Sequence, residues 1–275
     1  MLPLDTLCGF LSKVAPLKLA ESWDNVGLLV GDRGSKIGRV MTCLTITPDV
    51  VTEAIEHKAD LIVVHHPLPF QPLKRITSDT TTGNLLLRLI AHQIAVYSAH
   101  TAYDSAQEGI NQQWCQKLDI QNVKPLVEFQ PREEASPSNS KTISQEQIGS
   151  GRYGHLPEET QLIDLARKAA DSLQAPPARF VGNPKQKIRK IAFACGSGGS
   201  FVGNAVRCGC DAMVTGEATF HTCLEAKAQG LGLILLGHYA SERFAMEQLA
   251  TKLGKEFPDL RIWPSKIESD PVTQC

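Results

Sequence analysis

The chain has 275 residues, enough to bury a large core in one domain or in two lobes. Apolar residues make up 42% of it and charged residues 21%, as in ordinary globular proteins. The 28 basic and 29 acidic residues give a formal charge of −1. This balance excludes a broad electrostatic field that would attract nucleic acid or an anionic membrane.

The N-terminal segment predicts an amphipathic helix, because Leu4, Leu7, Phe10, Leu11 and Val14 recur at helical spacing. It lacks the basic start and continuous apolar stretch of a signal peptide, and no window of the chain reaches the roughly 18 apolar residues of a membrane span. The eight cysteines include no C-x-x-C pair, which is typical of free thiols in a reducing compartment. We therefore expect a cytoplasmic protein without membrane contacts.

The rest of the chain alternates short apolar runs with helical patterns, which predicts an α/β fold. In the first half, strands are expected at 39–47, 60–66 and 94–100, and helices at 48–59, 82–93 and 108–118. In the second half, strands are expected at 187–195, 211–217 and 231–238, and helices at 162–174, 200–209, 219–230 and 241–254. Between the halves, residues 128–151 are polar, Ser/Pro-rich and aperiodic, which predicts a linker or loop with a short edge strand near Ile148.

The two halves resemble each other when Asp60 is aligned with Asp211. This alignment pairs the segment of His100 and Asp104 with that of His238 and Glu242. An internal duplication of this kind predicts two similar mixed-sheet lobes, residues 1–127 and 152–275, and it predicts where polar residues converge.

Polar residues end several of the predicted strands, at the sheet edge where α/β folds bind ligands. His65 and His66 are adjacent, so one of them would face the core unless the backbone turns at the strand end. Both rings could then bind metal, or they could instead form hydrogen bonds with backbone carbonyls. His238 and Glu242 are spaced to lie on one helical face and to reach one ion, although Glu242 could instead stabilise the start of a helix.

Three histidines and two carboxylates at strand ends form a nitrogen and oxygen ligand set for one or two divalent metals. Five ligands exceed the usual number for one catalytic zinc, so a dinuclear site with a bridging carboxylate is the natural arrangement. The glycines of "ACGSGGSF" invite a phosphate-binding interpretation, but Phe201 replaces the third glycine of that motif. A tight strand-to-helix turn that borders the same cleft is the preferred interpretation.

Five motifs, "ESWDNVGLLVGD", "VVHHPLPF", "SAHTAYD", "TGEATFH" and "GHYASERF", occur in this order over nearly the whole chain. Together they resemble the Nif-three-like dinuclear-metal-centre family, whose members are often described as GTP cyclohydrolase I type 2 homologues. The resemblance implies two intertwined α/β lobes, a homohexameric ring, and two divalent ions per subunit (Zn, Fe, Mn, Ni or Co). It also implies that Glu242 bridges the two ions, within a ligand set of His65, His66, Asp104, His238 and Glu242.

Such a centre predicts a metal-dependent hydrolase, because two divalent ions and two carboxylates leave a net charge of about +2 that attracts a small anionic substrate and acidifies water. A nucleotide-like or phosphorylated substrate fits this charge, and a GTP cyclohydrolase activity would open a purine ring by hydrolysis. Besides Glu242, His100 is expected to orient a ligand through a hydrogen bond, and Glu217 and His221 to contact substrate or move a proton. The alternative is a non-enzymatic metal-binding scaffold that interacts with a regulator.

Overall fold

The computed structural model describes residues 1–130 and 148–273, which group into two compact units. The first unit contains residues 1–103 and 243–273, and the second lies within residues 104–242. The chain thus returns to the first unit near its end, as expected for intertwined lobes. The predicted repeats follow other boundaries, and their origin by duplication stays a prediction. Most of the predicted linker lies outside the described residues.

The first unit is built on a five-stranded sheet with the strand order β15-β4-β5-β6-β2. Only its edge strand β2 is antiparallel to its neighbour, and the other pairs are parallel. The strands are β2 (Gly27–Val30), β4 (Arg39–Cys43), β5 (Leu61–Val64), β6 (Ala95–Ser98) and β15 (Arg261–Pro264). A separate antiparallel pair joins β1 (Leu2–Pro3) to β3 (Lys36–Ile37).

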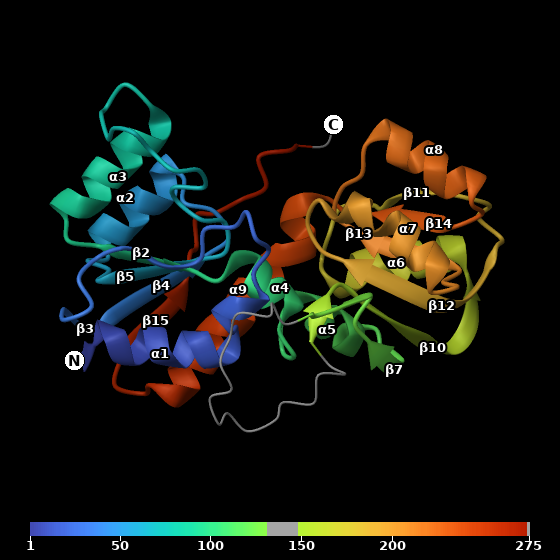
Figure 1. Cartoon of the computed structure of the whole chain (residues 1–275), viewed down its shortest axis with the longest axis horizontal. Helices are drawn as coiled ribbons and strands as arrows, with labels where there is room; N and C mark the ends of the chain where they lie inside the picture. The colour runs from blue at the N-terminus through green and yellow to red at the C-terminus, as the bar shows by residue number, and fades with distance from the viewer. Residues whose placement is uncertain (131–147, 274–275) are drawn as a thin grey trace. The chain divides into compact units, whose positions relative to one another are not determined.

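Helices cover both faces of this sheet, with α2 and α3 on one face and α1 and the later part of α9 on the other (Figure 1). Their bounds are α1 (Leu4–Val14), α2 (Pro48–Glu56), α3 (Thr81–Ala91) and α9 (His238–Glu256). Successive side chains along each strand point to opposite faces of the sheet. Met41 and Ile62 join the core under α2 and α3, whereas Thr42 donates a hydrogen bond of 2.8 Å to the carbonyl of Met246 in α9.

The second unit contains a six-stranded sheet with the strand order β11-β14-β13-β12-β10-β7. Its parallel core consists of three strands, and antiparallel strands extend it on both sides. The strands are β7 (Gln121–Lys124), β10 (Arg152–Gln161), β11 (Arg179–Val181), β12 (Lys187–Ala194), β13 (Ala212–Thr215) and β14 (Gly232–Leu235). The short strands β8 (Val127–Glu128) and β9 (Gly149–Ser150) pair with each other, close to the edge strand predicted near Ile148.

Helices also pack on both faces of the second sheet. Val202 of α7 and Ala226 of α8 belong to the core on one face, whereas Trp114 of α5 lies 5.8 Å from Phe193 of β12 between ring centroids. The helices of this unit are α5 (Ile110–Lys117), α6 (Leu162–Ser172), α7 (Val202–Arg207) and α8 (Phe220–Ala228). The short helix α4 (His100–Ser105) joins the two units in sequence.

The parallel parts of the two sheets share a local arrangement. Asp60 precedes β5 and accepts hydrogen bonds from the amides of Gly38 and Arg39, at the start of the preceding strand. Asp211 precedes β13 and accepts hydrogen bonds from the amides of Arg189 and Lys190 in the same way. The mixed α/β fold that the sequence predicts is confirmed, and so are the helices and strands it places, with bounds shifted by a few residues.

Candidate metal centre

The histidine pair lies at the carboxyl end of β5. The amide of His65 donates to the carbonyl of Cys43 (3.1 Å), and the amide of His66 donates to that of Leu44 (2.9 Å). These bonds extend the pairing of β5 with β4 beyond the last strand residue. The hydroxyl of Ser98 on β6 also donates to the carbonyl of His65 (2.7 Å). Both imidazoles are therefore held at the edge of the sheet where α/β folds place their ligands.

His100 completes a group of three imidazoles, which we call the histidine cluster (His65, His66 and His100). Ring centroids in the cluster lie 5.1 to 5.7 Å apart, and one nitrogen from each ring lies within 4.8 Å of the others. Three converging imidazoles are a donor set for first-row divalent ions. The histidine cluster belongs entirely to the first unit.

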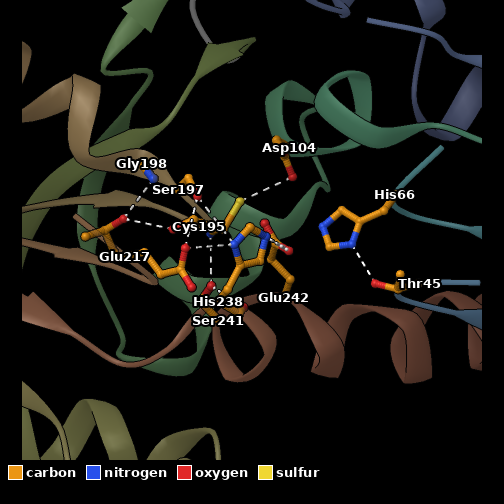
Figure 2. A network of polar contacts seen from close by, with 12 residues as sticks. Thr45, His66, Asp104, Cys195, Ser197, Gly198, Glu217, His238, Ser241 and Glu242 are labelled. Carbon is orange, nitrogen blue, oxygen red and sulfur yellow. Dashed lines mark hydrogen bonds and ion pairs between the residues drawn. The ribbon is translucent and has the colours of Figure 1, made fainter. Parts of the chain in front are cut away.

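A hydrogen bond orients the ring of His66. Its Nδ1 lies 2.7 Å from the hydroxyl oxygen of Thr45 (Figure 2), which assigns Nε2 as the nitrogen that would bind an ion. Thr45 is itself fixed, because its amide donates to the carboxylate of Glu268 at 2.6 Å. Arg243 pairs with the same carboxylate at 2.8 Å. None of these three residues is among the predicted site residues.

A carboxylate orients His100. Its Nδ1 lies 2.8 Å from Oδ1 of Asp24, whose side chain is fully buried, and Thr101 donates two further hydrogen bonds to the same carboxylate. Burial raises the pKa of Asp24, but the hydrogen bonds from His100 and Thr101 and the charge of His100 outweigh it, so the pKa is lowered. His100 has a φ of 23°, a backbone conformation that non-glycine residues rarely adopt and that this contact with Asp24 helps to hold.

The second unit brings an imidazole and two carboxylates together. His238 and Glu242 lie one turn apart at the start of α9, with 3.1 Å between Nε2 and Oε2, and Glu242 is only 3% exposed. Oε2 of Glu217 lies 3.4 Å from Nδ1 of the same ring (Figure 2). The hydrogen bond with Glu242 is the largest cause that raises the pKa of His238 to about 9, against the effect of burial. The two carboxylates therefore favour the positively charged form of the His238 ring.

The loop after β12 packs directly against the side chains of His238 and Glu242. At Gly196, φ is +57°, and an added Cβ would lie 2.1 Å from Oε1 of Glu242 and 3.2 Å from Nε2 of His238. The amide of Gly196 donates to the hydroxyl of Ser241 (2.9 Å). The glycine-rich turn therefore leaves the space that Glu242 occupies, in line with the expectation that it borders the site.

Asp104 contacts the thiol of Cys195, a residue outside the predicted ligand set. Sγ of Cys195 donates to Oδ1 of Asp104 across 3.2 Å, and the amide of Cys195 donates to Oδ1 of Asn111 (2.9 Å). Burial, followed by the charges of Asp104 and Glu242, raises the pKa of Cys195 well above its ordinary value. The thiol therefore stays protonated at neutral pH and orients Asp104. Its position directly after β12 is the sequence feature that could have pointed to it.

The predicted site residues thus divide between the two units. The histidine cluster lies in the first unit, whereas Asp104, Glu217, His238 and Glu242 lie in the second. His221 is exposed on α8, and among the described residues its ring contacts that of Phe220, with 5.8 Å between centroids. The complete five-residue ligand set and the catalytic roles of His100, Glu217, His221 and Glu242 stay predictions.

The fold and these two groups of side chains define an α/β protein with candidate metal ligands at the carboxyl edges of parallel strands. The chain belongs to the Duf34/NIF3 (NGG1p interacting factor 3) family, whose model matches residues 3–271. This result confirms the family resemblance found in the sequence.

Relatives match almost the whole chain. A Clostridium perfringens protein named GTP cyclohydrolase 1 type 2 homolog is 33% identical over 269 residues, which cover 98% of both chains. A Schizosaccharomyces pombe protein named Protein NIF3 homolog is 34% identical over 268 residues, covering 93% of this chain and 92% of the relative. A solved Staphylococcus aureus hypothetical protein covers 100% of both chains, with a TM-score of 0.87 and 30% identity. Within residues 1–130 and 148–273, no helix is long and apolar enough to cross a membrane.

We predict that the Asp24→Asn variant is less stable than the unmodified protein at neutral pH, by about 1 kcal/mol, because a neutral amide accepts weaker hydrogen bonds from His100 and Thr101. The lowered pKa of Asp24 means that its contribution is present above the ordinary value of 3.8 and is lost as the pH falls through the folded-state pKa. Urea unfolding from pH 7 down to pH 3 measures this difference. The exposed residue Asp259 provides the control substitution, Asp259→Asn. A difference independent of pH would contradict a charged Asp24 as the partner of His100.

Proposed function

We propose that this protein binds two divalent metal ions through His65, His66, Asp104, His238 and Glu242, with Glu242 bridging the ions. The observation that carries the proposal is the environment of Glu242. This carboxylate is 3% exposed and lies against His238, in a space that only a glycine at position 196 leaves open. An imidazole nitrogen and a carboxylate oxygen held this close together form part of a donor set for divalent ions. The family membership and the oriented rings of His66 and His100 support the same assignment.

The donor atoms fit first-row divalent ions, because imidazole nitrogens and carboxylate oxygens are their usual ligands. When bound, such ions lower the pKa of coordinated water and neutralise anionic groups. The chain's own residues prepare this chemistry. Thr45 and Asp24 hold the rings of His66 and His100, and the Cys195 thiol holds the carboxylate of Asp104. Glu217 contacts both His238 and the hydroxyl of Ser197 (3.2 Å), a position from which it can accept a proton.

The proposed activity is hydrolysis of a small anionic substrate that is nucleotide-like or phosphorylated. Two divalent ions supply four positive charges and two carboxylates remove two, so the site attracts anions. His100, Glu217, His221 and Glu242 are the proposed residues for proton transfer or substrate contact. Relatives that carry the name GTP cyclohydrolase 1 type 2 homolog support a nucleotide-like substrate. We place the protein in the cytoplasm.

A second candidate function is a non-enzymatic metal-binding scaffold that interacts with a regulator. The family description, NGG1p interacting factor 3, favours this alternative. The two functions differ in one measurement. Hydrolysis of nucleotides or phosphate esters that requires divalent metal and disappears in Glu242→Gln supports the enzyme, whereas partner binding that survives removal of the metal supports the scaffold.

The assembly we propose is a homohexamer. Closed rings of identical subunits have point symmetry, and each subunit then presents complementary surfaces to its neighbours. Static light scattering is expected to give a mass near six times the chain mass of 30.0 kDa. A monomer at all concentrations would contradict this assembly and leave the metal-binding proposal to be tested separately.

We predict that Gly196→Ala weakens metal binding about 10- to 100-fold, the range seen when residues that position metal ligands are changed. The added methyl group would collide with the Glu242 carboxylate and crowd His238. Gly209→Ala is the matched control, because Gly209 has a similar φ of +66° and no atom within 4 Å of the added Cβ. Titration of both purified variants with Zn²⁺ or Mn²⁺ measures the affinity. Equal losses in both variants would mean that backbone strain, and not contact with Glu242, is responsible.

Substitutions of the proposed ligands are expected to affect different ions. His66→Ala should reduce occupancy of the ion shared with Asp104, and His65→Ala that of the ion shared with His238. Glu242→Gln should weaken both, because the bridge loses the charge that screens the two cations from each other. Elemental analysis of the variants, with melting curves recorded with and without chelator, tests these expectations. Full metal content in all three variants would contradict the dinuclear assignment.

A further inference from the structure

Two large aromatic side chains of the first unit lie side by side and exposed. Trp23 is 56% exposed and Phe70 is 46% exposed, and their ring centroids are 5.8 Å apart with an angle of 48° between the ring planes. We call these two residues the aromatic pair. A single exposed aromatic residue is ordinary in globular proteins. Two exposed rings in contact keep apolar surface in water, which costs free energy unless a ligand covers it.

Hydrogen bonds fix the two loops that carry the aromatic pair. The side-chain amide of Asn25 donates to the carbonyl of Pro69 (2.7 Å), which ties the residues beside Trp23 to those beside Phe70. Between Trp23 and Asn25, the carboxylate of Asp24 accepts hydrogen bonds from Thr101 and contacts the ring of His100. The rings are therefore held in place before any ligand arrives, which lowers the entropy cost of binding.

The aromatic pair adjoins the histidine cluster. The ring of His100 is edge-on to both members, at 76° in each case, with centroid distances of 6.0 Å to Trp23 and 6.1 Å to Phe70. The same imidazole is 5.1 Å from His65 and 5.7 Å from His66. One imidazole thus separates the exposed aromatic surface from the candidate metal ligands.

We infer that the aromatic pair binds a planar aromatic ring of the substrate, while an anionic group of the same molecule is directed to the metal centre. Aromatic side chains stack on the faces of nucleobases and similar heterocycles, and the metal ions supply the charge that attracts a phosphate. The ligand class is a phosphorylated heteroaromatic compound such as a nucleoside monophosphate. This inference rests on the proposed function and assigns Trp23 and Phe70 as substrate-binding residues.

Tryptophan fluorescence can report on this binding directly. The chain has three tryptophans, and Trp114 and Trp263 are 1% and 8% exposed, so Trp23 is the one available to a ligand in solution. Guanosine monophosphate is expected to quench the emission in a saturable way, after correction for its absorbance with free tryptophan. Ribose 5-phosphate has the anion without the ring, and it is expected to leave the emission unchanged and to bind about 10- to 100-fold more weakly.

Substitutions separate the ring contact from the metal contact. Trp23→Leu and Phe70→Leu keep an apolar side chain without a ring, and each is expected to weaken guanosine monophosphate binding about 10-fold in equilibrium dialysis. Binding of ribose 5-phosphate and metal content should stay unchanged. Trp23→Phe keeps a ring and should retain most of the affinity. Ile90→Ala is the control, because Ile90 is a 51% exposed apolar side chain on α3 of the same unit.

Several results would overturn the inference. The first is equal affinity of the protein for guanosine monophosphate and ribose 5-phosphate. The second is an affinity for guanosine monophosphate that is the same in Trp23→Leu, Phe70→Leu and the unmodified protein. The third is loss of metal from both Leu variants. Protection of Trp23 from acrylamide quenching in the ligand-free protein would also overturn it, because a second copy of the chain would then cover the pair. Failure of the proposed function is a different outcome. In that case the nucleotide binds through the aromatic pair, but the protein holds no metal or shows no metal-dependent turnover.

Discussion

Two backbone hydrogen bonds beyond the end of β5 fix the position of the histidine pair. They join the amide of His65 to Cys43 and the amide of His66 to Leu44, so both residues stay in register with β4 after the regular strand has ended. Successive amides of a regular strand point to opposite sides, so two consecutive amides bonded to the same neighbouring strand mean that the backbone turns at the histidine pair. The two ring centroids then lie 5.1 Å apart at the sheet edge. The contacts of Thr45, Asp24 and the aromatic pair are all arranged around this edge.

Three side chains around the candidate centre are each oriented by a neighbour from another part of the same unit. A hydroxyl orients His66, a buried carboxylate orients His100, and a thiol orients Asp104. Such outer contacts fix the tautomer and direction of metal ligands, and their loss commonly costs 10- to 100-fold in affinity. The donor types are consistent with this role, because the first unit contributes imidazole nitrogens and the second contributes carboxylates close to His238.

The sequence predicts the parallel strands and their crossover helices well, because apolar runs and helical periodicity determine both. It does not predict β10 (Arg152–Gln161), whose polar residues lack an alternating pattern, or the short strands β2 and β15. The residues of the candidate site likewise include some that the sequence predicts and some that it does not. His65, His66, His238 and Glu242 are found from their spacing and their place at strand ends. Asp24 and Thr45 are not, because their roles depend on contacts over 76 and 21 residues of sequence that only the folded chain brings together.

We propose that two divalent ions share the carboxylate of Glu242. Electron paramagnetic resonance of the protein loaded with Mn²⁺ tests this claim most directly, because a shared ligand couples the electron spins of neighbouring ions. A shared Glu242 carboxylate predicts two ions per chain and a spectrum of exchange-coupled Mn²⁺, which changes to that of isolated ions in Glu242→Gln. A spectrum of isolated Mn²⁺ in the unmodified protein at full loading would contradict it.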